Sequence, residues 1–176
     1  MTKLFLTFLA CCVLGASFAQ SPHKISIYLQ TQFTRTLYDR TKGNNSEGIG
    51  LGLEGYFCNR SKIKPTIVFT ADAYLLDDKV ARLNGDNEIL DDVSGMINLL
   101  GGVSYHPVNK FYASLVAGPS FIGSQTLFAV KPSIGIFFSN TQRWTGKISY
   151  LNVFDRDKES KRDFGAISVA IGLRLY

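Results

Sequence analysis

The sequence is poor in cysteine, in charged residues and in long apolar runs. Three of its 176 residues are cysteine, and 19% are charged, which is a low charged fraction for a globular protein. The low charge and the 45% content of hydrophobic residues exclude an intrinsically disordered chain. Long runs of strong helix formers are also missing, which argues against a helical bundle. The net charge of +5 is modest and scattered, so the chain lacks the basic patch of a nucleic-acid-binding protein.

The first nineteen residues have the pattern of a secretory signal peptide. Lys3 supplies a positive charge, residues 4–15 are almost entirely apolar or small, and Ser17 and Ala19 place small residues before a cut after Ala19. The apolar stretch is shorter than the roughly 20 residues of a membrane-spanning helix. We therefore predict export, with residues 1–19 removed and residues 20–176 forming one domain.

Cysteine chemistry contributes little once this segment is removed. Cys11 and Cys12 lie within it, and a lipoprotein anchor at either position would leave an apolar region of only about seven residues. The remaining Cys58 cannot form an intramolecular disulfide or a metal site alone. We expect no disulfide, metal or cofactor.

The rest of the chain alternates apolar and polar residues with a period of two, and no window is apolar enough for a spanning helix. In the first block, Ile25, Ile27 and Leu29 alternate with Ser26, Tyr28 and Gln30. Alternation of this kind is typical of a strand with one apolar face. Eight such blocks occur, at residues 25–34, 48–57, 66–75, 97–105, 111–120, 128–138, 144–150 and 166–175.

The connections between these blocks also alternate, between short and long. Short polar connections lie at residues 59–62, 106–109 and 139–142. The other set is long and polar, with one short member, and lies at residues 38–47, 77–94, 122–125 and 155–163. Short turns at one rim and longer loops at the other are typical of outer-membrane barrels. The pattern predicts an all-β fold, an eight-stranded antiparallel up-and-down transmembrane β-barrel.

The dimensions and the two faces of the strands favour a membrane. A tilted strand of about 11 residues rises on the order of 28 Å, close to the thickness of the hydrocarbon core, and the sheet must close because backbone groups in lipid need internal partners. The face opposite the apolar one carries five charged residues: Glu54, Asp72, Lys131, Lys147 and Arg174. We predict that these charges form a network inside the barrel, where each needs a partner. An eight-stranded barrel is filled by its own side chains, which excludes a wide pore.

Two further features concern the outward face. Aromatic residues near the block ends fit the girdles found at membrane interfaces: Phe57, Tyr105, Phe111, Phe128, Phe138, Trp144 and Tyr176. Pro132 also faces outward, and since proline cannot donate to the ladder we expect a bulge or a local break there.

The alternative to a membrane barrel is a soluble sandwich or ligand-binding barrel in the periplasm, whose apolar face would point inward.

The signal peptide, the eight alternating blocks, the trimmed turns and the terminal aromatic residue resemble the small outer-membrane β-barrel proteins of Gram-negative bacteria, the OmpA/OmpX-like group. This resemblance of pattern covers nearly all of residues 20–176. It implies a cell outer membrane location, termini in the periplasm, a monomer, and recognition of the last strand by the barrel-assembly machinery. In that group the final aromatic residue shares the face of the outward apolar residues, whereas Tyr176 here has the other parity. The implied role is structural, adhesive or surface-interacting.

Enzymatic activity is the second interpretation, because some small barrels of this kind modify lipid A. The chain has two histidines: His23 precedes the first block, and His106 is predicted to lie in a tight turn. Ser104 is on the same face as His106, which makes a weak nucleophile–base pair at the periplasmic end. We predict no catalytic residues.

The long connections carry the remaining candidate residues. Asp86 and Glu88 lie in an acidic segment whose spacing does not match a calcium loop. A mixed-charge segment carries Lys158, Lys161 and Arg162. Such external charges could contact lipopolysaccharide or a partner at the cell surface.

Overall fold

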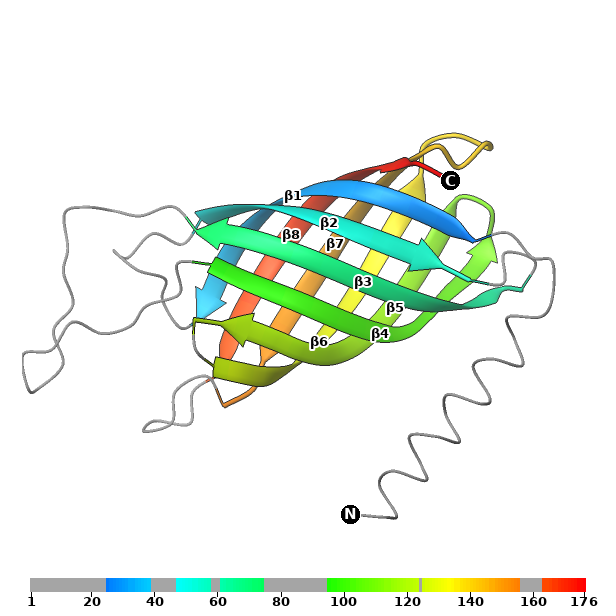
Figure 1. Cartoon of the computed structure of the whole chain (residues 1–176). Helices are drawn as coiled ribbons and strands as arrows, with labels where there is room; N and C mark the ends of the chain where they lie inside the picture. The colour runs from blue at the N-terminus through cyan, green and yellow to red at the C-terminus, as the bar shows by residue number, and fades with distance from the viewer. Residues whose placement is uncertain (1–24, 39–46, 58–60, 75–94, 124, 156–162) are drawn as a thin grey trace, which may run out of the picture.

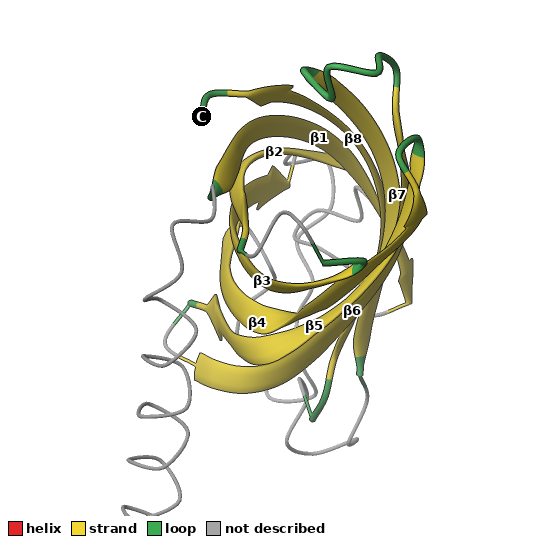
Figure 2. Ribbon diagram, turned by 90° about the vertical axis from the view of Figure 1, so that its right-hand side faces the viewer, coloured by secondary structure: helices red, strands yellow, loops and turns green. Residues whose placement is uncertain are grey.

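The computed structural model describes residues 25–38, 47–57, 61–74, 95–123, 125–155 and 163–176. They form one closed sheet in which each strand pairs with its neighbour in the chain and the last pairs with the first (Figures 1 and 2). All of the pairings are antiparallel. The strands are β1 (Ser26–Tyr38), β2 (Glu47–Tyr56), β3 (Ile63–Tyr74), β4 (Gly95–Val108), β5 (Phe111–Ile122), β6 (Gln125–Phe137), β7 (Trp144–Val153) and β8 (Phe164–Arg174). The predicted fold class is confirmed.

The barrel has two unlike ends. We call the turn end the one where β1 begins, where β8 ends, and where β2–β3, β4–β5 and β6–β7 are joined by short connections. At the opposite end, the loop end, longer connections join β1–β2, β3–β4 and β7–β8, and a short one joins β5–β6. Residues 39–46, 75–94, 124 and 156–162 at the loop end lie outside the described part of the chain. The external charges predicted at Asp86, Glu88, Lys158, Lys161 and Arg162 therefore have no described position, and the same holds for the predicted signal peptide.

One predicted turn is wrong. His106 and Pro107 belong to β4, which continues to Val108, so the reversal falls at Asn109 and Lys110. The pairing of β4 with β5 shifts register between Tyr105 and Val108. The strand continues because His106 points into the barrel and its ring contacts aromatic side chains there, which a solvent-exposed turn residue would not do.

Pro132 interrupts the ladder on one side only. It pairs with Leu115 of β5, whereas the pairing of β6 with β7 has no partners at Lys131 and Pro132. Pairing resumes from Ser133 in the same register. The missing N–H thus leaves a local break without a bulge.

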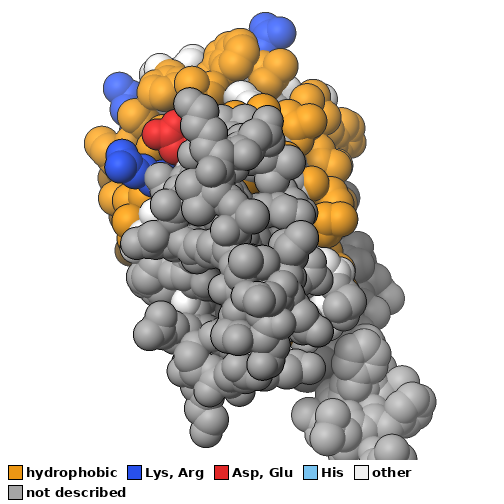
Figure 3. Space-filling view, turned by 90° about the vertical axis from the view of Figure 1, so that its left-hand side faces the viewer, with side chains coloured by type: hydrophobic (Ala, Val, Ile, Leu, Met, Phe, Trp, Pro, Cys, Tyr) orange, Lys and Arg blue, Asp and Glu red, His pale blue; other side chains and the backbone are white. Residues whose placement is uncertain are grey.

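The outer wall is apolar over its whole circumference. Leu51 is 61% exposed and Ile134 is 65% exposed, and Ile27 and Phe69 also point outward. Figure 3 shows apolar side chains on the wall that surrounds the loop end. At the turn end the exposed wall residues include several aromatic ones: Tyr105, Phe111, Phe138 and Trp144. The apolar faces of the strands therefore form a single outward band.

The interior has three tiers along the barrel axis. An aromatic tier of Tyr28, Tyr56, Tyr112 and Phe137 fills the turn end. A polar tier follows, and an apolar tier fills the part nearest the loop end. The members of the apolar tier are Val68, Tyr74, Met96, Leu100, Val116, Ile122, Ala129, Leu151, Val153, Phe164 and Ala166. The buried charges therefore occupy the middle of the barrel, whereas the inward positions nearer the loop end are apolar.

Inward glycines of β2 make space for larger side chains of β3. Gly48 pairs with Tyr74, Gly50 with Asp72, and Gly52 with Thr70. A Cβ atom at any of these glycines would meet the side chain of its partner at or inside ordinary contact distance. The alternating glycines therefore let the Asp72 carboxylate lie over β2 inside a narrow barrel.

Candidate functional site

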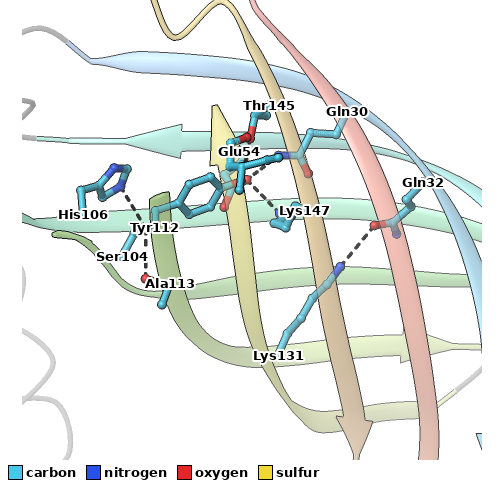
Figure 4. Close-up of polar contacts among 11 residues, drawn as sticks. Gln30, Gln32, Glu54, Ser104, His106, Tyr112, Ala113, Lys131, Thr145 and Lys147 are labelled. Atoms are coloured by element: carbon cyan, nitrogen blue, oxygen red, sulfur yellow. Dashed lines mark hydrogen bonds and ion pairs between the residues drawn. The ribbon is translucent and has the colours of Figure 1, made fainter. Parts of the chain in front are cut away.

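The polar tier contains an ion pair that crosses the barrel interior. The Glu54 carboxylate on β2 accepts a hydrogen bond of 2.8 Å from Lys147 Nζ on β7, through Oε2 (Figure 4). Gln30 Nε2 on β1 donates to the same oxygen. Glu54 is 0% exposed and Lys147 is 3% exposed, so both charges are shielded from water and lipid. Among the described residues, Glu54 Oε1 has no hydrogen-bond partner.

A second pair of charges is joined through an amide. Lys131 Nζ on β6 donates a hydrogen bond of 3.3 Å to Gln32 Oε1, and Gln32 Nε2 donates to Asp72 Oδ1. Thr34 Oγ1 lies 3.5 Å from the same carboxylate oxygen. Gln32 therefore relays the interaction between Lys131 and Asp72, whose side chains are both buried. The two cations and two anions of the polar tier balance.

Arg174 lies away from this network. It is the last residue of β8, it is partly exposed at the turn end, and its Nε donates a hydrogen bond of 2.9 Å to the main-chain oxygen of Tyr176. The structure thus brings together four of the five predicted interior charges and places the fifth at the rim. The Arg174 side chain lies outside the polar tier because Arg174 is at the turn end of β8, where the barrel opens.

Ser104 and His106 form the pair that the sequence suggested as a weak nucleophile–base combination. Ser104 Oγ lies 3.1 Å from His106 Nε2, and both side chains are buried (Figure 4). The His106 ring stacks on Tyr112 and Phe137 and meets the edge of Tyr56. His106 Nδ1 has no partner within the described ranges, so no carboxylate orients the imidazole as a catalytic triad would require.

The described residues contain no group of three or more His, Cys, Asp and Glu side chains that could hold a metal ion. Within the same ranges, no helix is long and apolar enough to cross a membrane.

Sequence reasoning did not single out Gln30 and Gln32 as members of the network. Their parity placed both of them on the inward face, and an amide that faces inward among charged residues is the signal that could have found them. The partners themselves could not be found, because β2 and β7 are brought opposite one another only when the sheet curves into a barrel.

By sequence, no family model and no curated protein matches the chain. By structure, the chain is similar to the attachment invasion locus protein Ail of Yersinia pestis. The structure of Ail in complex with the heparin analogue sucrose octasulfate aligns with a TM-score of 0.56 and 13% identity over 88% of this chain and 100% of that one. A second crystal structure of Ail gives 0.53 and 12% over 86% and 97%. The backbone structure of the outer membrane protein Ail in a phospholipid bilayer nanodisc gives 0.51 and 10% over 86% and 100%. At these identities the likeness concerns the fold.

Proposed function

We propose that the chain is an integral protein of the Gram-negative outer membrane, with a structural, adhesive or surface-interacting role. The observation that carries this proposal is an inverted barrel: compared with a soluble protein, the apolar residues are on the outside and the charged ones are inside. Large apolar side chains such as Leu51 and Ile134 form its outer wall, while Glu54 and Lys147 are sealed inside. A protein in water buries its apolar side chains, and an apolar band of this size exposed to water would cause aggregation. In a bilayer the same apolar band contacts the acyl chains of the lipids, where it is stable.

The inversion also argues against a soluble ligand-binding barrel. In that architecture Ile27 and Phe69 would pack against one another in the centre, but here they point away from it. The barrel lumen is occupied by the aromatic, polar and apolar tiers, which supports a closed scaffold without a wide pore.

A surface role is supported by what the fold presents to the outside. The connections of the turn end are short, and most of the residues between strands are in the connections of the loop end. The structural neighbours include an attachment protein bound to a heparin analogue. We therefore place binding in the loops, to lipopolysaccharide or to a sulfated polysaccharide. The barrel acts as a monomer of the OmpA/OmpX-like group and reaches the membrane through recognition of its last strand by the assembly machinery.

The membrane part of the proposal is tested by extraction. Membranes from cells producing the full chain are washed with high salt and with urea and then treated with detergent, and the protein is run on a gel with and without heating. We expect release only with detergent, and faster migration of the unheated protein, as for a closed barrel. A chain that stays in solution without detergent would overturn the proposal.

The surface part is tested by binding of intact cells to immobilised heparin. The first variant replaces Lys158, Lys161 and Arg162 with Gln, and the matched control replaces Asp86 and Glu88 with Asn and Gln. We expect the loss of loop cations to weaken binding and the loss of loop anions to leave it or strengthen it. Equal binding by cells without the protein would refute this role.

Enzymatic modification of lipid A is the second candidate, and the contact between Ser104 and His106 is the observation that favours it. The acyl chains of lipid A from cells with the protein, without it and with Ser104→Ala are compared by mass spectrometry. A scaffold gives the same acyl pattern in all three. An acyl change that needs Ser104 would establish the enzyme instead.

A further inference from the structure

The charges of the chain are divided along the barrel axis. Among the described residues the turn end carries five cations: Lys62, Lys64, Lys110, Arg143 and Arg174. The sequence of this end has no Asp or Glu in residues 55–65, 101–117, 133–150 and 165–176. The described carboxylate side chains lie either in the balanced polar tier or near the loop end, at Glu47, Asp155 and Asp163. The positive charge of the turn end is therefore uncompensated by side chains.

These cations belong to one continuous rim. The main-chain N–H of His106 donates to Lys62 O at 2.7 Å, which ties β4 to the β2–β3 turn. Gln142 Nε2 donates to Asn109 O at 3.0 Å, which ties the β6–β7 turn to the β4–β5 turn. The N–H of Arg174 donates to Arg143 O at 2.8 Å, which ties the end of β8 to the β6–β7 turn.

The three turn cations are the accessible part of this rim. Lys62, Lys110 and Arg143 are exposed, whereas Lys64 is buried and Arg174 Nε donates a hydrogen bond to the main-chain oxygen of Tyr176. We call Lys62, Lys110 and Arg143 the basic rim.

The basic rim lies at the level of the outward aromatic residues. Lys110 precedes Phe111, and Arg143 precedes Trp144, and both of these aromatic side chains are exposed on the barrel wall. Aromatic side chains at strand ends occupy the interface between acyl chains and headgroups. An adjacent Lys or Arg at a turn then reaches the headgroup phosphates while its stem stays along the wall.

We infer that the basic rim binds the headgroups of anionic phospholipids in the leaflet at the turn end. This inference rests on the proposed membrane location and adds a lipid preference to it. Each Lys or Arg near an anionic bilayer surface increases the equilibrium constant for contact with anionic lipid by about five-fold. Because the polar tier is neutral, the interior charges do not cancel this attraction. The rim thus concentrates anionic lipid at one end of the barrel.

The chain has one tryptophan, and it reports on this location. Trp144 is 47% exposed on the outer wall and follows Arg143 directly. The full chain is folded into vesicles of phosphatidylcholine and phosphatidylglycerol at one fixed ratio. In one set the phosphatidylglycerol carries brominated acyl chains, and in the other the phosphatidylcholine does. The ratio of Trp144 quenching in the two sets, relative to bulk composition, measures the local enrichment of the anionic lipid.

We expect phosphatidylglycerol to be enriched about two- to five-fold around Trp144 at low salt, and less at high salt. The variant with Lys62→Gln, Lys110→Gln and Arg143→Gln should show quenching in proportion to bulk composition. Lys110→Gln alone, which keeps Arg143 beside Trp144, should show part of the loss. The matched control is Arg35→Gln, which removes an exposed cation of β1 near the loop end and should keep the enrichment.

The outcomes separate this inference from the membrane proposal. Quenching by both lipids in proportion to bulk composition in the unmodified chain would overturn the basic rim and leave the membrane location standing. Absence of quenching by either lipid would overturn the membrane location itself. Enrichment that persists in the triple variant would also overturn the basic rim, since the preference would then come from elsewhere on the wall.

Discussion

Replacing Lys147 with Met tests the ion pair of the polar tier most directly. The substitution keeps much of the side-chain volume but removes the cation that bonds Glu54 Oε2. Glu54 is fully buried, and its other oxygen has no partner among the described residues, so Gln30 becomes its remaining donor. Removing one member of a buried pair leaves an uncompensated charge and costs about 3–5 kcal/mol. We expect the free energy of unfolding to fall by the lower part of that range, because Gln30 still donates.

The measurement is equilibrium unfolding by urea of the chain folded into neutral vesicles, followed by Trp144 fluorescence and by gel migration. The double variant Glu54→Gln with Lys147→Met removes both charges and should recover most of the loss, because no buried charge remains. The coupling between the two sites is obtained from the cycle of single and double variants. If Lys147→Met unfolds at the same urea concentration as the unmodified chain, or if the double variant is simply the sum of the singles, the ion pair does not stabilise the barrel as described.

The remaining predictions use the same unfolding assay. Lys131→Met should cost less than Lys147→Met, about 1–3 kcal/mol, because Lys131 bonds Gln32 and reaches Asp72 only through that amide. Gly135→Ala should destabilise the barrel by about 1–3 kcal/mol, because its Cβ would overlap the Tyr112 ring, which is held by a hydrogen bond to Thr145. Gly101→Ala is its control, with no atom within 4 Å of the added Cβ, and a loss as large as that of Gly135→Ala would refute the packing argument. Ile134→Lys should cost about 2–4 kcal/mol if that wall position faces acyl chains, and no loss would place it outside the bilayer.

The strands and their facing could be predicted because both depend on local sequence. Alternation fixes which side chains share a face, so it places Leu51 and Glu54 on opposite sides without any knowledge of strand pairing. The end of β4 could not be predicted in this way. His106 and Pro107 are typical of a turn by composition, but the His106 ring contacts Tyr112 on β5 and also Tyr56 on β2 and Phe137 on β6, two strands that are remote in sequence.

The partners inside the barrel depend on strand tilt and closure, which alternation does not encode. Parity predicts that Lys131 and Asp72 share the interior, but it does not predict that Gln32 lies between them. Arg174 was assigned inward by parity, but its height on the barrel axis places it at the rim. The apolar tier was missed for a similar reason. Pairs such as Leu99 and Leu100 supply apolar side chains to both faces, and parity alone does not say which tier an inward residue joins.

The ion pair between β2 and β7 has a consequence for assembly. In an open sheet these strands are five positions apart, and at about 4.8 Å for each strand Glu54 and Lys147 would be separated by on the order of 24 Å. The seam between β1 and β8 has to form before the two side chains can meet across the lumen. An incomplete barrel entering the bilayer would therefore carry two unneutralised charges, besides its unpaired edges. Partly closed intermediates are therefore disfavoured both by their unneutralised charges and by their unpaired strand edges. We expect insertion and closure to occur as a single cooperative step.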